Sequence, residues 1–429
     1  DQLGKGSLFT NIAGHPSWQV CSQILADRRK WALALSLTED ELLDAISRKL
    51  SNPIDPVVVD GAGAPVREVV QVGDEASLLD LPAMMTSEKD GGAYIASGMA
   101  IYRDPETGIR NFSIHRQQVM GSHKTGFVML PRQARRIYDK YHAKGEAMPV
   151  AIAIGAHPAI LFASGYTTEF GIDELSLAGG LLGDPVRLIK CETVGLEAPA
   201  DAEIILEGEI LPDHTEPEGP FGEVPGTYAN AGTAEIFQLK AITRRRSPIF
   251  YALHCGAPVT ETQAITGLGI EIGTWEHLRR VEGGLDLLDI CCVPAAGDML
   301  LVVKLRPRVE GQAKTALMAA LSGPYLHPKL AIAVDDDIDA SDLRQVMWSM
   351  TTRVHAERDV VMIPNTRVFA LDNISPQAPG DNPFNRIGTK WLIDATKPAL
   401  TQTEERARFA RALPKNFDDV DIKEFLPEL

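Results

Sequence analysis

The pattern of hydrophobic residues changes near residue 275, and this change limits the folds that the chain can adopt. Between about residues 95 and 255, short apolar or alternating segments such as VAIAIGA and IFQLKAITR predict β-strands. One well-marked helix interrupts them at 131–144, with Pro131 at its start and Gly145 just past its end. After about residue 275, helical stretches alternate with apolar strands such as MLLVVKLRP. The sequence therefore predicts an α+β protein in which a barrel-like, strand-rich domain precedes an α/β unit.

The same change of pattern divides the chain into parts. We expect an N-terminal α+β region, a strand-rich domain, an α/β domain and a helical tail, at residues 1–90, 91–275, 276–400 and 401–429. In the first part, residues 36–50 are typical of an amphipathic helix with a capping box between Thr38 and Glu41. In the last, residues 402–413 predict a charged helix.

The charge balance and the cysteines exclude several classes of protein. The 429 residues include 42 basic and 58 acidic side chains, a net charge of −16, which argues against a nucleic-acid or anionic-membrane partner. Five cysteines without a CxxC pair do not indicate a disulfide framework, so we expect a reducing cytoplasm. The chain opens on Asp1 without a secretory signal, and we expect the natural start to be missing. The longest apolar stretch, 148–165, contains Pro149 and Pro158 and is too interrupted to span a membrane.

The segment EGPFGE is the sharpest local feature, and it carries two carboxylates, Glu218 and Glu223. On one continuous strand, side chains five residues apart would face opposite ways. Gly219, Pro220 and Gly222 make such a strand improbable, and a turn could bring both carboxylates to one cavity. A plain surface loop is the alternative.

The strand-like segment NFSIHR places Asn111, Ser113 and His115 on one face and Arg116 on the other. An arginine flanked by apolar residues must find a carboxylate or reach solvent. These two interpretations of Arg116 stay open at this point.

Two glycine-containing segments resemble ligand loops to different degrees. Residues 164–174, SGYTTEFGIDE, offer backbone N–H groups and hydroxyls to a phosphate. Residues 267–273, GLGIEIG, have the wrong spacing for a dinucleotide fingerprint, and we interpret them as a connector.

The motifs NFSIHR, LLGDPVRLIKCET, EGPFGE and VDDDID follow one another in this order between Asn111 and Lys397. In this combination the chain resembles the UbiD-like family of prenylated-FMN-dependent decarboxylases. The resemblance implies a split β-barrel flavin-binding domain, flanked by an N-terminal α+β region and a C-terminal α/β domain used in oligomerisation. It also implies a catalytic network of Arg116, Glu218 and Glu223, in which Glu223 delivers the proton.

The resemblance extends to a metal ion that helps to hold the flavin phosphate. Asn111 and Glu174 match two ligands of this metal, and their oxygen atoms suit Mn2+ or Mg2+, with K+ as a further candidate ion. Gln133 stands where the family has a histidine, and His123 is the alternative third ligand. The remaining residues that we assign to the cofactor are Ser113, Ile114, Arg116, Arg132, Ser164, Tyr166 and Lys390.

The implied activity is the reversible, non-oxidative decarboxylation of an aromatic, heteroaromatic or α,β-unsaturated carboxylic acid, with Arg116 holding the substrate carboxylate. His254 and Leu371 are candidates for the substrate pocket, although His254 as a structural histidine is the alternative. A flavin prenyltransferase would supply the cofactor, and we expect a homo-oligomer, a dimer or larger. The rival hypotheses are a carboxylase subunit of a larger complex and a non-catalytic assembly subunit. Burying an arginine with two glutamates is costly, which argues against the non-catalytic role.

Overall fold

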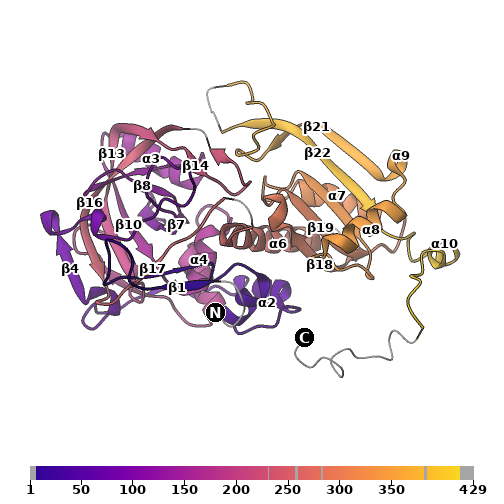
Figure 1. Ribbon diagram of the computed structural model, residues 1–429, viewed down its shortest axis with the longest axis horizontal. Coiled ribbons are helices and arrows are strands. Elements are labelled where there is room, and N and C mark those ends of the chain that lie inside the picture. The colour runs from indigo at the N-terminus through magenta and orange to yellow at the C-terminus, as the bar shows by residue number, and fades with distance from the viewer. Residues whose placement is uncertain (1–5, 230, 257–258, 282–283, 381–383, 416–429) are drawn as a thin grey trace.

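Helix α6 (Glu261–Val281) lies between two units of different architecture (Figure 1). The computed structural model describes residues 6–229, 231–256, 259–281, 284–380 and 384–415. Before α6 the chain forms a curled antiparallel sheet with helices, and after it a five-stranded α/β sheet. Within these described ranges, no helix combines the length and the hydropathy needed to cross a membrane.

The curled sheet has nine strands and is built around two long ones, β13 (Ile204–Glu218) and β16 (Gly232–Arg244). Their register shifts after Glu207 and again after Ile210. Such bulges bend a strand and increase its twist, so the sheet closes into a half-barrel. The other strands are β4 (Val69–Val72), β5 (Tyr94–Ile95), β6 (Met99–Arg103), β7 (Arg110–Ile114), β8 (Gln117–Val119), β9 (Lys124–Phe127) and β10 (Met148–Ile154).

Three helices accompany this sheet. The predicted helix at 131–144 is confirmed as α3 (Gln133–Ala143), and Gly145 follows it in the left-handed conformation. The apolar stretch at 148–165 divides into β10 and α4 (Pro158–Gly165). Helix α5 (Glu174–Leu182) was not predicted, because a helix that is buried on nearly all sides has no polar face and therefore no helical periodicity.

Two predicted helices are shorter than expected. Helix α2 (Leu42–Leu50) begins after Glu41, because the Thr38 hydroxyl donates to the Glu41 carboxylate instead of capping a backbone amide. The helix predicted at 402–413 is confined to α10 (Thr403–Ala407).

The interpretation of residues 267–273 as a connector is wrong, because they form the middle of α6. A Cβ atom on Gly273 would come 2.6 Å from the Tyr325 ring, and one on Gly269 would lie 3.2 Å from the Tyr325 hydroxyl. The glycines therefore let the helix backbone approach a tyrosine of the second unit.

The second unit has the predicted alternation of helices and strands. In its sheet, β19, β20 and β22 run parallel, and β18 and β21 are antiparallel edge strands. Helices α7 (Gln312–Leu321) and α8 (Leu343–Arg353) pack on it. The strands are β18 (Asp286–Cys292), β19 (Leu300–Arg306), β20 (Leu330–Val334), β21 (Val360–Val368) and β22 (Arg386–Ala395). The predicted domain limits stay predictions, and α6 runs across the one placed at residue 275.

Short elements join the N-terminal region to the half-barrel. Strand β2 (Gln19–Ser22) pairs with both β1 (Ser7–Phe9) and β17 (Ile249–Tyr251). Strand β11 (Arg187–Lys190) pairs with both β3 (Val57–Val58) and β12 (Glu197–Pro199). Helix α1 (Arg28–Ala34) follows β2, and Asp27 caps it.

Candidate active site

Arg116 lies between β7 and β8, and its guanidinium contacts both glutamates of the EGPFGE segment. Its Nε and Nη2 atoms donate to the Glu218 carboxylate over 3.2 and 3.0 Å. Its Nη1 atom donates to Glu223. All three side chains are mostly buried. Of the two interpretations of Arg116, a carboxylate partner or contact with solvent, the structure supports the first.

The two glutamates converge because the chain turns sharply between them. Glu218 is the last residue of β13, and Gly219 after it has a φ of +86°, which only glycine adopts without strain. Phe221 and Gly222 form the short strand β14 (Phe221–Gly222), which pairs with β15 (Tyr228–Ala229). The hairpin then closes through a bond of 2.9 Å from the Glu223 amide to the Thr227 carbonyl.

Burial and charge act in opposite directions on this network. Burial raises the pKa of Glu223, and the Arg116 guanidinium offsets only part of that effect. Burial lowers the pKa of Arg116, but Glu223 and Glu218 raise it by more, so the net shift is upward and the guanidinium keeps its charge. The Arg116 Cζ atom also lies 5.0 Å from the centroid of the Phe221 ring. The site therefore combines a permanent cation with a carboxyl group that tends to hold a proton.

Asn111, Gln133 and Glu174 form a second polar cluster, at the start of α3 and α5. The Asn111 Nδ2 atom lies 2.8 Å from Gln133 Oε1 and 2.8 Å from Glu174 Oε1. Burial raises the pKa of Glu174 to about 7. The Asn111 Oδ1 atom is buried and has no hydrogen-bond partner among the described residues. An orphaned amide oxygen beside a carboxylate and a second amide oxygen fits a cation with oxygen ligands.

His123 lies away from this cluster. Its Nδ1 atom is 2.8 Å from the Ser122 hydroxyl, and its ring lines a cavity with Thr193, Gln238 and Lys240 on the β16 side of the sheet. Of the two candidates for the third ligand, the structure brings only Gln133 to Asn111.

Ser113 on β7, Ser164 at the end of α4 and Tyr166 after it were assigned to the cofactor and are already hydrogen-bonded within the chain. The Ser113 hydroxyl lies 2.5 Å from the Tyr102 hydroxyl and 2.9 Å from His115 Nε2, and Ile114 ends β7. The Ser164 hydroxyl donates to the Leu161 carbonyl. Tyr166 donates to Glu276 over 3.2 Å.

Arg132 and Lys390 come from different units and share a neighbour, His327, which the sequence analysis missed. Burial lowers the pKa of Lys390 to about 8, and its Nζ atom donates to the Leu321 carbonyl. Burial, together with the nearby charges of Arg132 and Lys390, lowers the pKa of His327 to about 3. Lys390 is buried and Arg132 is exposed, and their two positive charges suit an anionic group such as a phosphate.

His254 and Leu371 come from different units of the fold. The His254 carbonyl accepts from Thr262, and burial lowers the pKa of the His254 ring. Leu371 is half-buried, and two residues later Asn373 donates to the Thr227 hydroxyl over 2.8 Å. This contact ties the second unit to the hairpin that carries Glu223.

Comparison with known proteins identifies the family. The family model described as the 3-octaprenyl-4-hydroxybenzoate carboxy-lyase Rift-related domain matches residues 57–258. The model of the C-terminal domain of the same carboxy-lyase matches residues 263–395. The chain belongs to the UbiD family of carboxy-lyases.

Individual relatives agree with this assignment. A phenolic acid decarboxylase of Bacillus subtilis is 30% identical over 408 residues, which cover 92% of this chain and 84% of the relative. The UbiD-class enzyme HmfF of Pelotomaculum thermopropionicum, solved with FMN, superposes with a TM-score of 0.89 at 32% identity, over 99% of this chain and 93% of HmfF. An evolved dimeric form of HmfF, solved with prenylated FMN, gives a TM-score of 0.86 at 31% identity and covers 99% and 92%.

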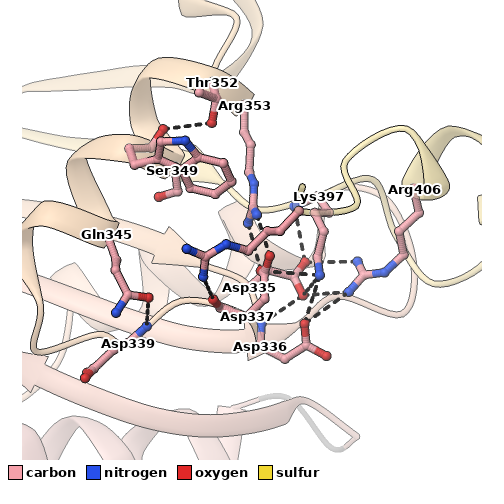
Figure 2. Close-up of polar contacts among 12 residues, drawn as sticks. Asp335, Asp336, Asp337, Asp339, Gln345, Ser349, Thr352, Arg353, Lys397 and Arg406 are labelled. Atoms are coloured by element: carbon pink, nitrogen blue, oxygen red, sulfur yellow. Dashed lines mark hydrogen bonds and ion pairs between the residues drawn. The ribbon is translucent and has the colours of Figure 1, made fainter. Parts of the chain in front are cut away.

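The VDDDID motif forms an ion cluster in the second unit of this UbiD protein (Figure 2). Arg406 and Lys397 contact Asp335 and Asp336, at 2.6 Å for Arg406–Asp335 and 3.0 Å for Lys397–Asp336. Arg353 pairs with Asp337 over 2.6 Å. Because each carboxylate has a basic partner, the cluster is explained as an anchor for the segment that contains α10, not as a metal site.

The sequence analysis also missed Tyr94 and Gln118, which contact the glutamate network from β5 and β8. No motif marks either residue, because their role depends on strand pairing.

Proposed function

We propose that this UbiD-family chain catalyses the reversible, non-oxidative decarboxylation of an aromatic, heteroaromatic or α,β-unsaturated carboxylic acid with prenylated FMN. The observation that carries the proposal is the buried guanidinium of Arg116 between Glu218 and Glu223. A guanidinium can hold a substrate carboxylate in a fixed orientation, and a neighbouring carboxyl group can return a proton to the product.

Glu223 is the better candidate for the proton donor. Glu218 accepts two guanidinium bonds and one from the Tyr94 hydroxyl, and three donors stabilise the charged form of a carboxylate. Glu223 accepts one guanidinium bond, and burial raises its pKa. In the proposed step the bond between the substrate carbon and its carboxylate breaks, and CO2 leaves. The Glu223 proton forms the new C–H bond, and solvent then returns a proton to Glu223.

The cofactor and its metal would lie between the Asn111–Gln133–Glu174 cluster and the cations Arg132 and Lys390. Asn111, Gln133 and Glu174 would hold Mn2+ or Mg2+ at the flavin phosphate, and Arg132 and Lys390 would add positive charge. When bound, prenylated FMN supplies the electron sink that an unactivated acid needs. Tyr166, Ser164 and the end of β7 would line its site.

The substrate would lie near the EGPFGE hairpin, with His254 and Leu371 as the proposed pocket residues. The phenolic acid decarboxylase activity of the B. subtilis relative makes hydroxylated aromatic acids the first class to test.

The test uses the chain purified after co-expression with a flavin prenyltransferase. Aromatic, heteroaromatic and acrylic acids are supplied one at a time, and CO2 release is measured with an apoprotein control. We expect at least one acid to be decarboxylated only by the holoprotein. Net fixation of labelled bicarbonate without any CO2 release would favour the carboxylase alternative. A protein that binds no flavin, as judged by its ultraviolet-visible spectrum, would favour the assembly alternative.

A further inference from the structure

Tyr94 contacts the glutamate network at Glu218, where its hydroxyl and the Arg116 Nε atom share one carboxylate oxygen, Oε1. Its hydroxyl donates to Glu218 Oε1 over 3.0 Å and lies 3.2 Å from Gln118 Oε1. The side chain is buried, and its ring lies against Phe221 with the centroids 4.5 Å apart. The Glu218 carboxylate therefore accepts hydrogen bonds from both a guanidinium and a phenol.

Gln118 holds the turn that Glu218 begins. Tyr94 and Gln118 are paired across β5 and β8. Gln118 Oε1 accepts from the Gly219 amide over 3.0 Å, and Gln118 Nε2 donates to the Gly91 carbonyl over 2.8 Å. A Cβ atom on Gly91 would come 2.3 Å from the Gly219 carbonyl oxygen, so only glycine permits this approach. The position of the Tyr94 hydroxyl relative to Glu218 is thus set by the sheet.

The Tyr94 phenol acts on the ionised Glu218 carboxylate as a donor. Burial and the neighbouring Glu218 carboxylate both raise the pKa of Tyr94, so the phenol keeps its proton. A hydrogen bond donated to a carboxylate in a buried site favours its charged form. Tyr94 makes this bond to Glu218, so the phenol adds to the difference between Glu218, which accepts two guanidinium bonds, and Glu223, which accepts one.

We propose that Tyr94 is a positioning residue that keeps the negative charge on Glu218 and thereby leaves the transferable proton on Glu223. The inference rests on the proposed function, because it concerns the protonation state of the same site. Two neighbouring carboxyl groups titrate as a pair, and a small difference in their surroundings decides which one holds the proton. The hydroxyl of Tyr94 contributes to that difference.

Other ionisable groups also face the two glutamates. Arg116 contacts both of them, Cys255 lies close to Glu223, and Asp90 lies close to Tyr94 and Cys255. Burial raises the pKa of Cys255, which keeps the thiol neutral. Tyr94 is therefore a neutral hydroxyl donor to Glu218, whereas Cys255 is a neutral thiol near Glu223.

The test is the pH dependence of kcat/KM for the holoenzyme and for Tyr94→Phe, with the best acid of the panel. Without the phenol, Glu218 takes up a proton more readily, so we expect the acid limb of the profile to move to higher pH by about one unit. The rate on the plateau should fall by roughly tenfold, because the proton is then shared between the two acids. Tyr138→Phe is the matched control, since it removes a buried hydroxyl that donates to the Leu211 carbonyl, away from the network.

A double variant separates the proposed effect from a loss of packing. In a Glu218→Gln background there is no carboxylate whose charge the Tyr94 hydroxyl could stabilise. Adding Tyr94→Phe should therefore not shift the pH profile of kcat/KM any further. An acid limb that coincides with that of the wild type, or a rate that falls equally at every pH, would overturn the inference. If the wild-type holoenzyme decarboxylates none of the acids, the proposed function itself fails, and the inference fails with it.

Discussion

At the scale of single residues, the two glutamates of the candidate site accept different numbers of hydrogen bonds. Glu218 meets the Arg116 Nε and Nη2 atoms as well as the Tyr94 hydroxyl, whereas Glu223 meets Nη1 alone among the guanidinium nitrogens. Burial raises the pKa of Glu223 above its usual value. A general acid must be protonated to act, so its activity is present below this pKa and is lost as the pH rises through it.

Replacing Glu223 by Gln tests this assignment. The amide keeps the size of the side chain but cannot deliver an acidic proton, so we expect turnover to fall by about 100- to 10,000-fold while the flavin stays bound. Solvent deuterium exchange into the reacting carbon of the product measures the proton step directly. If Glu223→Gln exchanges at the wild-type rate and Glu218→Gln does not, the two roles are reversed.

Replacing Glu174 by Ala tests the metal cluster. The change removes the carboxylate that lies 2.8 Å from Asn111 Nδ2, so we expect the holoprotein to lose its divalent metal and most of its flavin. Metal content by elemental analysis and the flavin absorbance give the two readings. Glu209→Ala, which removes a carboxylate paired with Lys240, is the control and should retain both. A Glu174→Ala protein with full metal occupancy would contradict the assignment.

At the scale of secondary-structure elements, α6 determines how closely the two units approach. It packs against β18 and α7 of the second unit and against α2 and α4 of the first. Gly269 and Gly273 face Tyr325, whose hydroxyl accepts from the Thr167 amide in the loop after α4. A small residue on this face is therefore required for contact between the half-barrel and the second unit.

Two glycine substitutions in α6 should have opposite effects. Gly273→Ala places a Cβ atom 2.6 Å from the Tyr325 ring, so we expect a loss of about 1–3 kcal/mol in the free energy of unfolding. Gly267→Ala meets no atom closer than 3.5 Å and should be neutral or stabilising by up to about 1 kcal/mol, because alanine favours a helix. Denaturant unfolding measures both. Equal stability of the two variants would show that Tyr325 does not limit the approach of α6.

At the scale of the whole molecule, the second unit exposes large apolar side chains. They include Met318 on α7, Met347 and Trp348 on α8, and Met362 on the edge strand β21. An edge strand with exposed apolar residues is a common site of association. The homo-oligomer predicted from the sequence is thus expected to form through this unit.

Light scattering at micromolar concentration tests the assembly, and we expect a dimer or a larger species. Met362→Lys should weaken it, because the lysine adds a charge to the exposed edge strand. Met85→Lys makes the same change at an exposed methionine of the first unit and should leave the mass unchanged. A wild-type chain that scatters as a monomer would contradict the prediction.

By itself, the sequence determined the order of the main elements, the division into a strand-rich half and an α/β half, and the family. These properties depend on local periodicity and on short motifs, which neighbouring residues carry. Prediction from the sequence failed where the local pattern was weak. Helix α5 is buried on nearly all sides and so lacks a helical period. The glycines of α6 resemble a loop until their contact with Tyr325 is known.

Only the tertiary structure decided which side chains meet. Arg116 reaches glutamates that lie 102 and 107 residues further along the chain, and Tyr94 reaches Glu218 across 124 residues. Such contacts depend on strand register and on the bulges that curl β13, and no single segment of sequence specifies them. The same holds for Gln133, the assigned third ligand, and His123, its alternative: the fold brings Gln133 to Asn111 and His123 to the β16 side of the sheet.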